Sequence, residues 1–254
     1  MSDMVSCLMV TCNRMDLARR SVACFEAQQW ADKELVIVDD GHQDYTPMLA
    51  PFIDRGLRIR YHRIERRESV RLGELRNLSL SLADSEWCMQ WDDDEWYHPE
   101  RIRVQMAARG SRSAVALKWT LMHLESPQHG TLTFRSDSGV ATPGTILHRR
   151  DAARYPNLSR NEDGVYLAAL RKQGMFVLGE AHSHLFVRCF HGGNTWDEQH
   201  FLSRLHRRPQ DWWPYLRAKA ANDLTLHPAF ALDSRELRTV RAMLAYRSEQ
   251  AVVT

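Results

Sequence analysis

The sequence predicts an α/β fold built on a sheet that begins parallel and becomes mixed. Two short, continuously apolar runs, at residues 5–11 and 34–38, fit strands that are buried on both faces. Between them, apolar residues at helical spacing over 17–25 predict a helix that Asp16 caps. A strand, a helix and a strand within this length form a βαβ unit, which implies parallel strands joined by a right-handed crossover.

The later elements follow from the same patterns. Strands are expected at 57–62, 87–91, 114–122, 130–134, 145–148, 175–178 and 187–190, and helices at 69–83, 100–106 (opened by Pro99) and 165–170. The alternating runs beyond residue 113 have an antiparallel character, so we expect a mixed sheet. Residues 196–254 read as helices that break at Pro209, Pro214 and Pro228. We therefore predict a domain over 1–195 and a helical C-terminal extension over 196–254.

Composition limits the classes of function. The chain has 254 residues with 44% hydrophobic and 26% charged residues, which is ordinary for a globular protein. A net charge of +2 argues against a nucleic-acid partner. The five cysteines are widely spaced and form no Cys-x-x-Cys pair, which fits a reducing compartment. The first residues lack a secretory signal, and no apolar segment approaches the ~18 residues of a membrane span, so we expect a cytoplasmic protein.

Four acidic residues follow the apolar segment that ends at Trp91, and we call residues 92–95 the acid run. Like charges repel, so such a run after a buried strand needs a reason; a solvated turn is the simpler interpretation and a divalent-cation site the more specific one. Mg²⁺ and Mn²⁺ prefer oxygen ligands. Alternate residues of an extended segment point the same way, so we predict that Asp92 and Asp94 share one ion while Asp93 faces elsewhere.

Polar residues also end the first two strands. Thr11 closes the first, and Asp39 and Asp40 close the second. Ligands of parallel sheets bind outside the carboxyl ends of the strands, so these residues are expected near a ligand.

Six motifs in this order resemble the GT-A-fold glycosyltransferases of family 2, mostly inverting enzymes that use nucleotide-diphosphate sugars. They are the turn at 10–14, the strand end at 36–41, Gly-x-x-Arg-Asn at 73–77, Asp-x-Asp at 92–95 with Pro99, the acidic pair Glu162-Asp163, and His-Gly-Gly at 191–193. The resemblance runs over residues 5 to 195. Glu95 departs from the family, which commonly has a further aspartate there, and this conservative change should leave the metal site intact.

The resemblance implies a GT-A fold, a Rossmann-like nucleotide-binding mixed sheet flanked by helices, with donor binding over 1–100 and acceptor binding over 101–195. Nucleotide-sugar contacts are implied for Thr11, Asn13, Arg14, Asp39, Asp40, Arg76 and Asp93. Metal binding, of Mn²⁺ or Mg²⁺, is implied for Asp92, Asp94 and His191. The general base is Asp163 or Glu162, and the spacing does not separate the two.

The implied function is metal-dependent, inverting transfer of a sugar from a nucleotide-diphosphate donor to a hydroxyl acceptor. UDP is favoured by its frequency in the family, and a saccharide or lipid-linked acceptor in bacterial polysaccharide or glycoconjugate synthesis is expected. One alternative is a sugar-phosphate nucleotidyltransferase, but the turn at 11–14 has no glycine for its phosphate loop. Another is a non-catalytic nucleotide-sugar binding module.

Two further features keep several interpretations open. The basic and aromatic segment 205–217 fits ordinary helix packing best, but also a peripheral contact with the inner face of a membrane, an acceptor platform or a homodimer through the C-terminal helices. His182 and His184, on an expected strand, are spaced like a pair of zinc ligands. No acidic or Cys partner at zinc spacing supports that interpretation.

Overall fold

The computed structural model describes residues 3–126, 128–194 and 196–253, and the chain divides into two compact units. Unit 1 comprises Met1–Leu117 and Ala141–Leu178, and unit 2 comprises Lys118–Val140 and Gly179–Thr254. The boundary predicted after residue 195 falls within unit 2. Thr195 itself lies outside the described residues, as do the first two residues, which belong to the segment where no secretory signal was expected. The division into a transferase domain and an extension stays a prediction.

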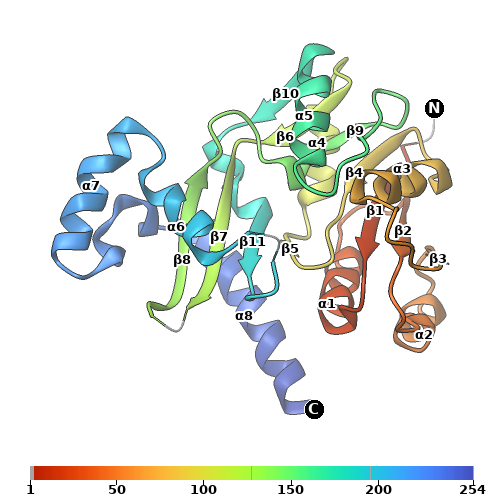
Figure 1. Ribbon diagram of the computed structural model, residues 1–254, viewed down its shortest axis with the longest axis horizontal. Helices are drawn as coiled ribbons and strands as arrows, with labels where there is room; N and C mark the ends of the chain where they lie inside the picture. Colours follow the sequence, from red (N-terminus) through yellow and green to blue (C-terminus); the bar gives the residue numbers. More distant parts are fainter. Residues whose placement is uncertain (1–2, 127, 195, 254) are drawn as a thin grey trace. The chain divides into compact units, whose positions relative to one another are not determined.

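Unit 1 is built on a seven-stranded sheet in the order β10-β6-β9-β4-β1-β2-β3 (Figure 1). The strands are β1 Val5–Thr11, β2 Lys33–Asp39, β3 Ile59–Arg63, β4 Trp87–Gln90, β6 Ala114–Leu117, β9 Leu147–Arg149 and β10 Met175–Leu178. Only β9 runs antiparallel to its two neighbours, β4 and β6. The α/β class and the mixed sheet predicted from the sequence are therefore confirmed.

The register of the sheet brings the polar strand ends together. Thr11 at the end of β1 lies opposite Asp39 at the end of β2. On the other side of β1, Gln90 lies opposite Leu8, and the backbone N–H of Trp91 still donates to the carbonyl of Leu8. The acid run consequently leaves the sheet beside the last residues of β1.

Helices of unit 1 connect the strands and differ from the prediction at three points. They are α1 Met15–Glu26, α2 Thr46–Asp54, α3 Leu72–Leu82, α4 Arg101–Ala108 and α5 Glu162–Lys172, with the short elements β5 Trp96–Tyr97 and η1 Pro143–Thr145. Arg14 is the N-cap of α1, so Asp16 lies in the first turn and is not the cap. Pro99 precedes α4 by two residues and does not open it. Helix α2 was not predicted because it contains two prolines, a residue that usually breaks helices. One of the two lies near the start of the helix, where proline is tolerated.

The single strand predicted over 114–122 is wrong, because the chain passes there from unit 1 to unit 2. β6 ends at Leu117, and β7 Trp119–Ser126 pairs antiparallel with β8 Gly130–Asp137 and parallel with β11 Phe186–Phe190. β6 and β7 are both apolar, so the hydrophobic pattern of the sequence does not show where the chain passes from one sheet to the other. The core of unit 2 packs against this sheet and contains Met122, Leu124, Leu132, Phe134, Phe201, Leu202 and Leu205.

The rest of unit 2 is mostly helical. Its elements are η2 Glu180–Leu185, α6 Glu198–Leu202, η3 Ser203–His206, α7 Pro209–Ala220, η4 Leu224–Leu226, η5 Pro228–Phe230 and α8 Ser234–Val253. Pro209 and Pro228 begin elements as predicted, but Pro214 lies inside α7, so the break expected there is wrong. His182 and His184 lie on the 3-10 helix η2 and not on a strand. Of the helices in the described part of the chain, none has the length and apolar content of a membrane span.

Candidate active site

The acid run is a turn that is held from two neighbouring elements. Residues 93–94 form the turn itself. The hydroxyl of Ser21 on α1 and the hydroxyl of Tyr97 on β5 both donate to the backbone carbonyl of Asp92, each at 2.9 Å. The extended segment that we expected is therefore not present, so strand alternation does not decide which carboxylates share an ion.

Asp93 is the most buried carboxylate of the run, with a side chain 6% exposed. Thr11 Oγ1 donates to its Oδ2 at 2.7 Å, and Arg14 Nη1 lies 3.5 Å from its Oδ1 and 3.2 Å from Oδ2 of Asp94. Burial and the neighbouring Asp94 carboxylate raise the pKa of Asp93 to about 7, although Arg14 and Thr11 act in the opposite direction. Negative charge is thus concentrated where water screens it poorly, a condition that favours a bound cation.

Arg76 joins the acid run to the start of α5. Its Nη2 donates to Asp92 Oδ1 and its Nε to Glu162 Oε1, both at 2.9 Å. Burial alone would lower the pKa of Arg76, but the surrounding carboxylates, Asp92 foremost, hold that pKa well above its usual value. Burial also raises the pKa of Glu162, against the effect of Arg76. One guanidinium thereby holds together the two acidic segments that were predicted to bind metal and to supply the base.

The Gly-x-x-Arg-Asn motif on α3 also positions the backbone that leads into α5. Gly73 donates its N–H to the carbonyl of Leu158 at 3.0 Å, and a Cβ on Gly73 would lie 1.9 Å from the carbonyl oxygen of Pro156. Asn77 makes two hydrogen bonds of 2.9 Å with the backbone of Tyr155. Each defined residue of the motif therefore contacts the segment 155–162, which explains why the spacing within the motif matters.

The structure separates the two candidate bases. The side chain of Glu162 is 3% exposed and accepts from Arg76, whereas Asp163 is half-buried in the first turn of α5. Asp163 Oδ1 accepts the N–H of Gly164 at 2.7 Å. Asn161 before them adopts a left-handed conformation with φ of 60°, and its side chain fills the space that a Cβ on Gly164 would need. Asp163 is thus the carboxylate of the pair that is more open to solvent.

Two residues predicted to contact nucleotide hold the strand-end loops. Asn13, with φ of 53°, accepts the N–H of His42 on its Oδ1 at 2.8 Å. Asp39 is fully buried; its Oδ1 accepts the N–H of Gly41 at 2.8 Å and its Oδ2 the hydroxyl of Tyr61 at 2.7 Å. A carboxylate oxygen accepts more than one hydrogen bond, so a ligand contact by Asp39 stays compatible with this arrangement.

Sequence reasoning missed two tyrosines that complete this corner. The rings of Tyr45 and Tyr61 stack with centroids 6.0 Å apart and an interplanar angle of 4°. The Tyr45 hydroxyl accepts the backbone N–H of Arg14 at 2.7 Å and lies 3.1 Å from Thr11 Oγ1. The alternating pattern at 57–62 predicted a strand that contains Tyr61, and this strand pairs with β2. That pattern was the signal in the sequence that could have placed Tyr61 near Asp39.

The remaining predicted residues lie as follows. Asp40 is partly buried, and its backbone N–H donates to the carbonyl of Thr11 at 3.3 Å. His191 belongs to the loop after β11 in unit 2, where its N–H donates to Asn194 Oδ1 at 2.8 Å and its Nδ1 accepts from Gly193 at 3.3 Å. Its metal role stays a prediction from the sequence.

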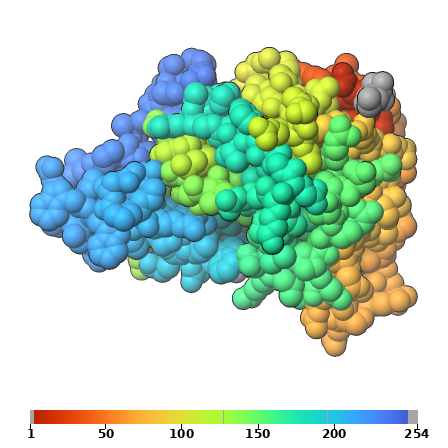
Figure 2. All heavy atoms as spheres, turned by 90° about the horizontal axis from the view of Figure 1, so that it is seen from above, coloured from red at the N-terminus to blue at the C-terminus, as the bar shows by residue number. Residues whose placement is uncertain are grey.

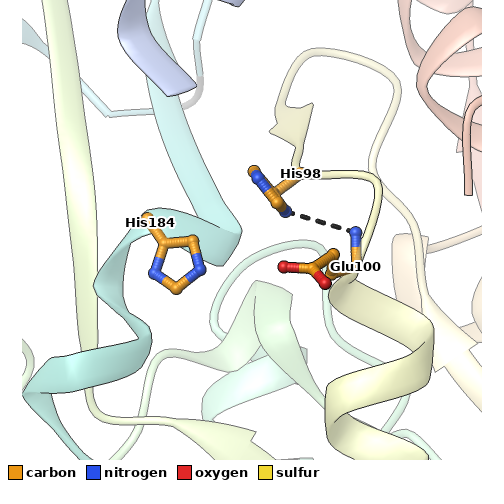
Figure 3. Close-up of side chains that lie close together, drawn as sticks. All are labelled: His98, Glu100 and His184. Atoms are coloured by element: carbon orange, nitrogen blue, oxygen red, sulfur yellow. Dashed lines mark hydrogen bonds between the residues drawn. The ribbon is translucent and has the colours of Figure 1, made fainter. Parts of the chain in front are cut away.

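The turn that contains Pro99 is fixed to the end of α1. The N–H of Glu100 donates to Nδ1 of His98 at 3.2 Å (Figure 3). Gln28 donates through Nε2 to the carbonyl of His98 at 2.9 Å and accepts the N–H of Ile102 on Oε1 at 3.1 Å. The proline of the predicted motif thus belongs to a turn that links the acid run to α4.

Helix α7 exposes part of the basic and aromatic segment, and its atoms lie at the surface (Figure 2, blue). Trp212 is 59%, Trp213 70% and Leu216 50% exposed, while Leu205 and Ala218 are buried. The packing interpretation therefore explains the buried residues but not the two tryptophans. The membrane, acceptor and homodimer interpretations stay predictions.

The residues present fit a hard divalent cation. Asp92 and Asp94 supply carboxylate oxygens at the end of the sheet, and their side chains are 21% and 16% exposed. Oxygen donors of this kind, partly open to solvent, suit Mg²⁺ or Mn²⁺, which keep some water or phosphate ligands.

Comparisons with known proteins identify the family of part of the chain and its fold. Residues 6–129 match the family model described as "Glycosyl transferase family 2". The structure is similar to S. aureus TarS 1-349 (TM-score 0.58, 16% identity, 97% of this chain and 92% of that chain). It is also similar to TarS 1-349 in complex with UDP-GlcNAc (TM-score 0.59, 18% identity, 86% and 66%). A third match is the mannosyltransferase PcManGT from Pyrobaculum calidifontis in complex with GDP-Man and Mn²⁺ (TM-score 0.54, 16% identity, 96% and 75%). At such identities the similarity shows a shared fold, here the GT-A fold predicted from the sequence.

Proposed function

Because residues 6–129 form a glycosyl transferase family 2 domain, we propose that this glycosyltransferase moves a sugar from a nucleotide-diphosphate donor to a hydroxyl acceptor with inversion, using Mn²⁺ or Mg²⁺. The single observation that supports this most is the bridge from Asp92 through Arg76 to Glu162. It links the acid run, for which we propose cation binding, to the carboxylate pair that contains the proposed base.

In this proposal Asp92 and Asp94 hold the metal ion. When bound, the ion supplies Lewis-acid stabilisation of the charge that develops on the leaving diphosphate. Arg76 holds Asp92 in place through a 2.9 Å hydrogen bond. Thr11 and Arg14 hold the Asp93 carboxylate, and the loops around Asn13 and Asp39 form the nucleotide end of the site.

Asp163 acts as the general base. The proton of the acceptor hydroxyl passes to the Asp163 carboxylate, while the acceptor oxygen forms a bond to the anomeric carbon. The bond from that carbon to the diphosphate breaks on the opposite face, and the nucleoside diphosphate leaves with its electron pair. Glu162 is less suited to this step because it is buried and accepts a hydrogen bond from Arg76. Its role is to fix the guanidinium.

For the donor we propose a UDP-sugar. TarS is described in complex with UDP-GlcNAc, which supports this choice, while the mannosyltransferase is described with GDP-Man, so both bases belong in the assay. For the acceptor we propose a saccharide or lipid-linked saccharide of polysaccharide or glycoconjugate synthesis in the cytoplasm, with the exposed tryptophans of α7 available for a peripheral membrane contact.

The change Asp163→Asn tests the proposal. It removes the base but keeps the size of the side chain and an acceptor for the N–H of Gly164. We expect kcat to fall by about 10²- to 10⁴-fold, the usual contribution of a general base, and donor affinity to stay within about threefold. The readouts are steady-state transfer and donor titration, with the product's anomeric configuration from NMR as the check on inversion.

The matched control is Asp151→Asn, an exposed aspartate of the same unit, which should transfer at the rate of the wild type. Transfer that survives Asp163→Asn would show that the base has been assigned to the wrong residue. Equal loss in Glu162→Gln and Asp163→Asn, with donor affinity kept in both, would show that the pair acts together.

A further inference from the structure

A polar cavity lies entirely within unit 2, and the acid run contributes nothing to it. Its volume is about 230 Å³, and the side chains that matter most to its chemistry are Trp119, Asp137, Arg204, Arg208, Asp211 and His227. They come from the start of β7, the end of β8, η3, the start of α7 and the residue before η5. None of them belongs to the site derived from the sequence motifs.

The carboxylates of this cavity are already matched by cations. Arg208 contacts Asp137 Oδ2 through Nη1 and both oxygens of Asp211 through Nε and Nη2, all at 2.8 Å. Lys118 Nζ lies 3.4 Å from Asp137 as well. The same Arg208 guanidinium lies over the ring of Trp119, 5.0 Å from its centroid. A cationic ligand would therefore have to displace strong, bidentate ion pairs.

Arg204 is a cation of the cavity that has no carboxylate beside it in the described residues. In the part of the chain that the structure describes, its one hydrogen bond joins Nη2 to Nε2 of His200 at 3.1 Å. Burial, together with the positive charges of Arg207 and Arg188, lowers the pKa of Arg204 to about 10. A guanidinium held near like charges in a partly buried position is stabilised by a bound anion.

His227 supplies a second donor, one that makes no hydrogen bond of normal geometry among the described residues. It is 5% exposed, and its Nδ1 accepts the N–H of Ala229 at 3.1 Å. Burial lowers the pKa of His227, against the backbone carbonyl and the carboxylate of Asp211, which act to raise it. The ring is therefore neutral at pH 7, and it carries its proton on Nε2 because Nδ1 accepts a hydrogen bond. Nε2 is buried and makes no hydrogen bond to any described residue. A buried donor without an acceptor is costly, and a ligand oxygen would remove that cost.

We propose that this cavity binds the anionic group, phosphate or carboxylate, of a ligand about the size of one sugar residue, with Arg204 and His227 as the donors. Trp119, whose ring Arg208 covers on one side, and the ion-paired Asp137 and Asp211 also line the cavity. They offer a sugar apolar surface and hydrogen-bond acceptors. The volume equals that of roughly seven to eight waters, which is enough for a sugar phosphate or a uronic acid but small for a nucleotide sugar. The inference does not depend on the function proposed for unit 1.

Calorimetric titration of the full chain tests the proposal. The ligands are glucose 6-phosphate, glucuronate, inorganic phosphate and glucose, all with EDTA present so that metal-assisted phosphate binding at the acid run does not contribute. We expect one or both of the anionic sugars to bind, inorganic phosphate to bind more weakly, and glucose to bind at least about tenfold more weakly than the better anionic sugar. Whether the phosphate or the carboxylate binds tighter identifies the natural anionic group.

Two variants locate the binding. Arg204→Gln removes the cation and should weaken the anionic sugar about tenfold or more. His227→Asn keeps an oxygen that accepts the N–H of Ala229 but removes the Nε2 donor, and should weaken it about threefold to tenfold. The matched control Arg207→Gln makes the same charge change at an exposed neighbour that does not line the cavity, and should change affinity less than about twofold.

Three results would overturn the proposal. They are no binding of either anionic sugar at millimolar concentration, glucose binding as tightly as glucose 6-phosphate, or an unchanged affinity in both Arg204→Gln and His227→Asn. Circular dichroism checks that each variant is folded, and if Arg204→Gln fails to fold, His227→Asn decides. Because EDTA is present throughout, failure here would leave the metal-dependent function of unit 1 untouched.

Discussion

Two polar regions of this chain use their arginines differently. In the site of unit 1, each of two guanidiniums contacts two carboxylates: Arg14 contacts Asp93 and Asp94, and Arg76 contacts Asp92 and Glu162. In the cavity of unit 2, Arg208 likewise serves Asp137 and Asp211, but Arg204 meets no carboxylate among the described residues. The first region contains more carboxylates than guanidinium groups. The second contains a guanidinium, Arg204, with no ion pair to a carboxylate, and a neutral donor, His227 Nε2, with no hydrogen bond among the described residues.

The difference teaches that the overall charge of a protein says little about what its sites bind. A net charge of +2 describes neither region. What distinguishes them is which groups the fold has already paired. On this reasoning the first region suits a cation and the diphosphate that accompanies it, and the second suits an anion. The comparison is tested by removing one arginine from each region.

The largest effect is expected for Arg76→Ala. Glu162, 3% exposed, would lose its cation, and Asp92 would lose the hydrogen bond that fixes it. Breaking a buried ion pair on one side leaves an uncompensated charge, so the free energy of unfolding should fall by about 3–5 kcal/mol. Denaturant unfolding monitored by fluorescence measures this loss.

The control for that change is Arg71→Ala at the start of the same helix. Arg71 is exposed, and among the described residues its side chain makes one long hydrogen bond, 3.5 Å from Nη1 to Ser159 Oγ. Its removal should alter the free energy of unfolding by no more than about 0.5 kcal/mol. Should Arg76→Ala cost no more than Arg71→Ala, the bridge would not hold the site together.

The small effect is expected for Arg204→Gln without ligand. This arginine has no carboxylate to leave unpaired, and Arg188 and Arg207 repel it. The free energy of unfolding should therefore change by less than about 1 kcal/mol, in either direction, in the same denaturant experiment. A loss as large as that of Arg76→Ala would mean that Arg204 is a structural partner and that the contrast between the two regions is false.

The sequence predicted the framework of unit 1 well, for a physical reason. Strands buried on both faces, such as β1 and β2, appear as short continuous apolar runs. Helix α2 was missed because Pro47 and Pro51 read as breakers, although the structure accommodates both. The run 114–122 was read as one strand because the apolar pattern is the same on either side of the point where the chain changes sheet.

The residues of the proposed site were named from the sequence, but the contacts between them were not predicted. The acid run, Arg76 and the acidic pair were all identified from their motifs. Arg76 donates a hydrogen bond to Glu162, which is 86 positions away in the chain, and not to Asp163. This choice depends on how the backbone folds, so the sequence does not reveal it. The donors Arg204 and His227 have no signature in the sequence. Among the described residues, what distinguishes them is that Arg204 has no ion pair with a carboxylate and that His227 Nε2 makes no hydrogen bond.

Thermal unfolding with UDP, GDP and their sugars, with and without Mn²⁺ or Mg²⁺, tests the central claim most directly. A ligand at 100 times its Kd adds about 2.7 kcal/mol to the free energy of unfolding, so Tm should rise by several degrees with nucleotide and metal together. The account predicts that the rise requires the metal and disappears in Asp94→Asn. If no nucleotide diphosphate or sugar nucleotide raises Tm in a metal-dependent way, the proposed donor site is contradicted.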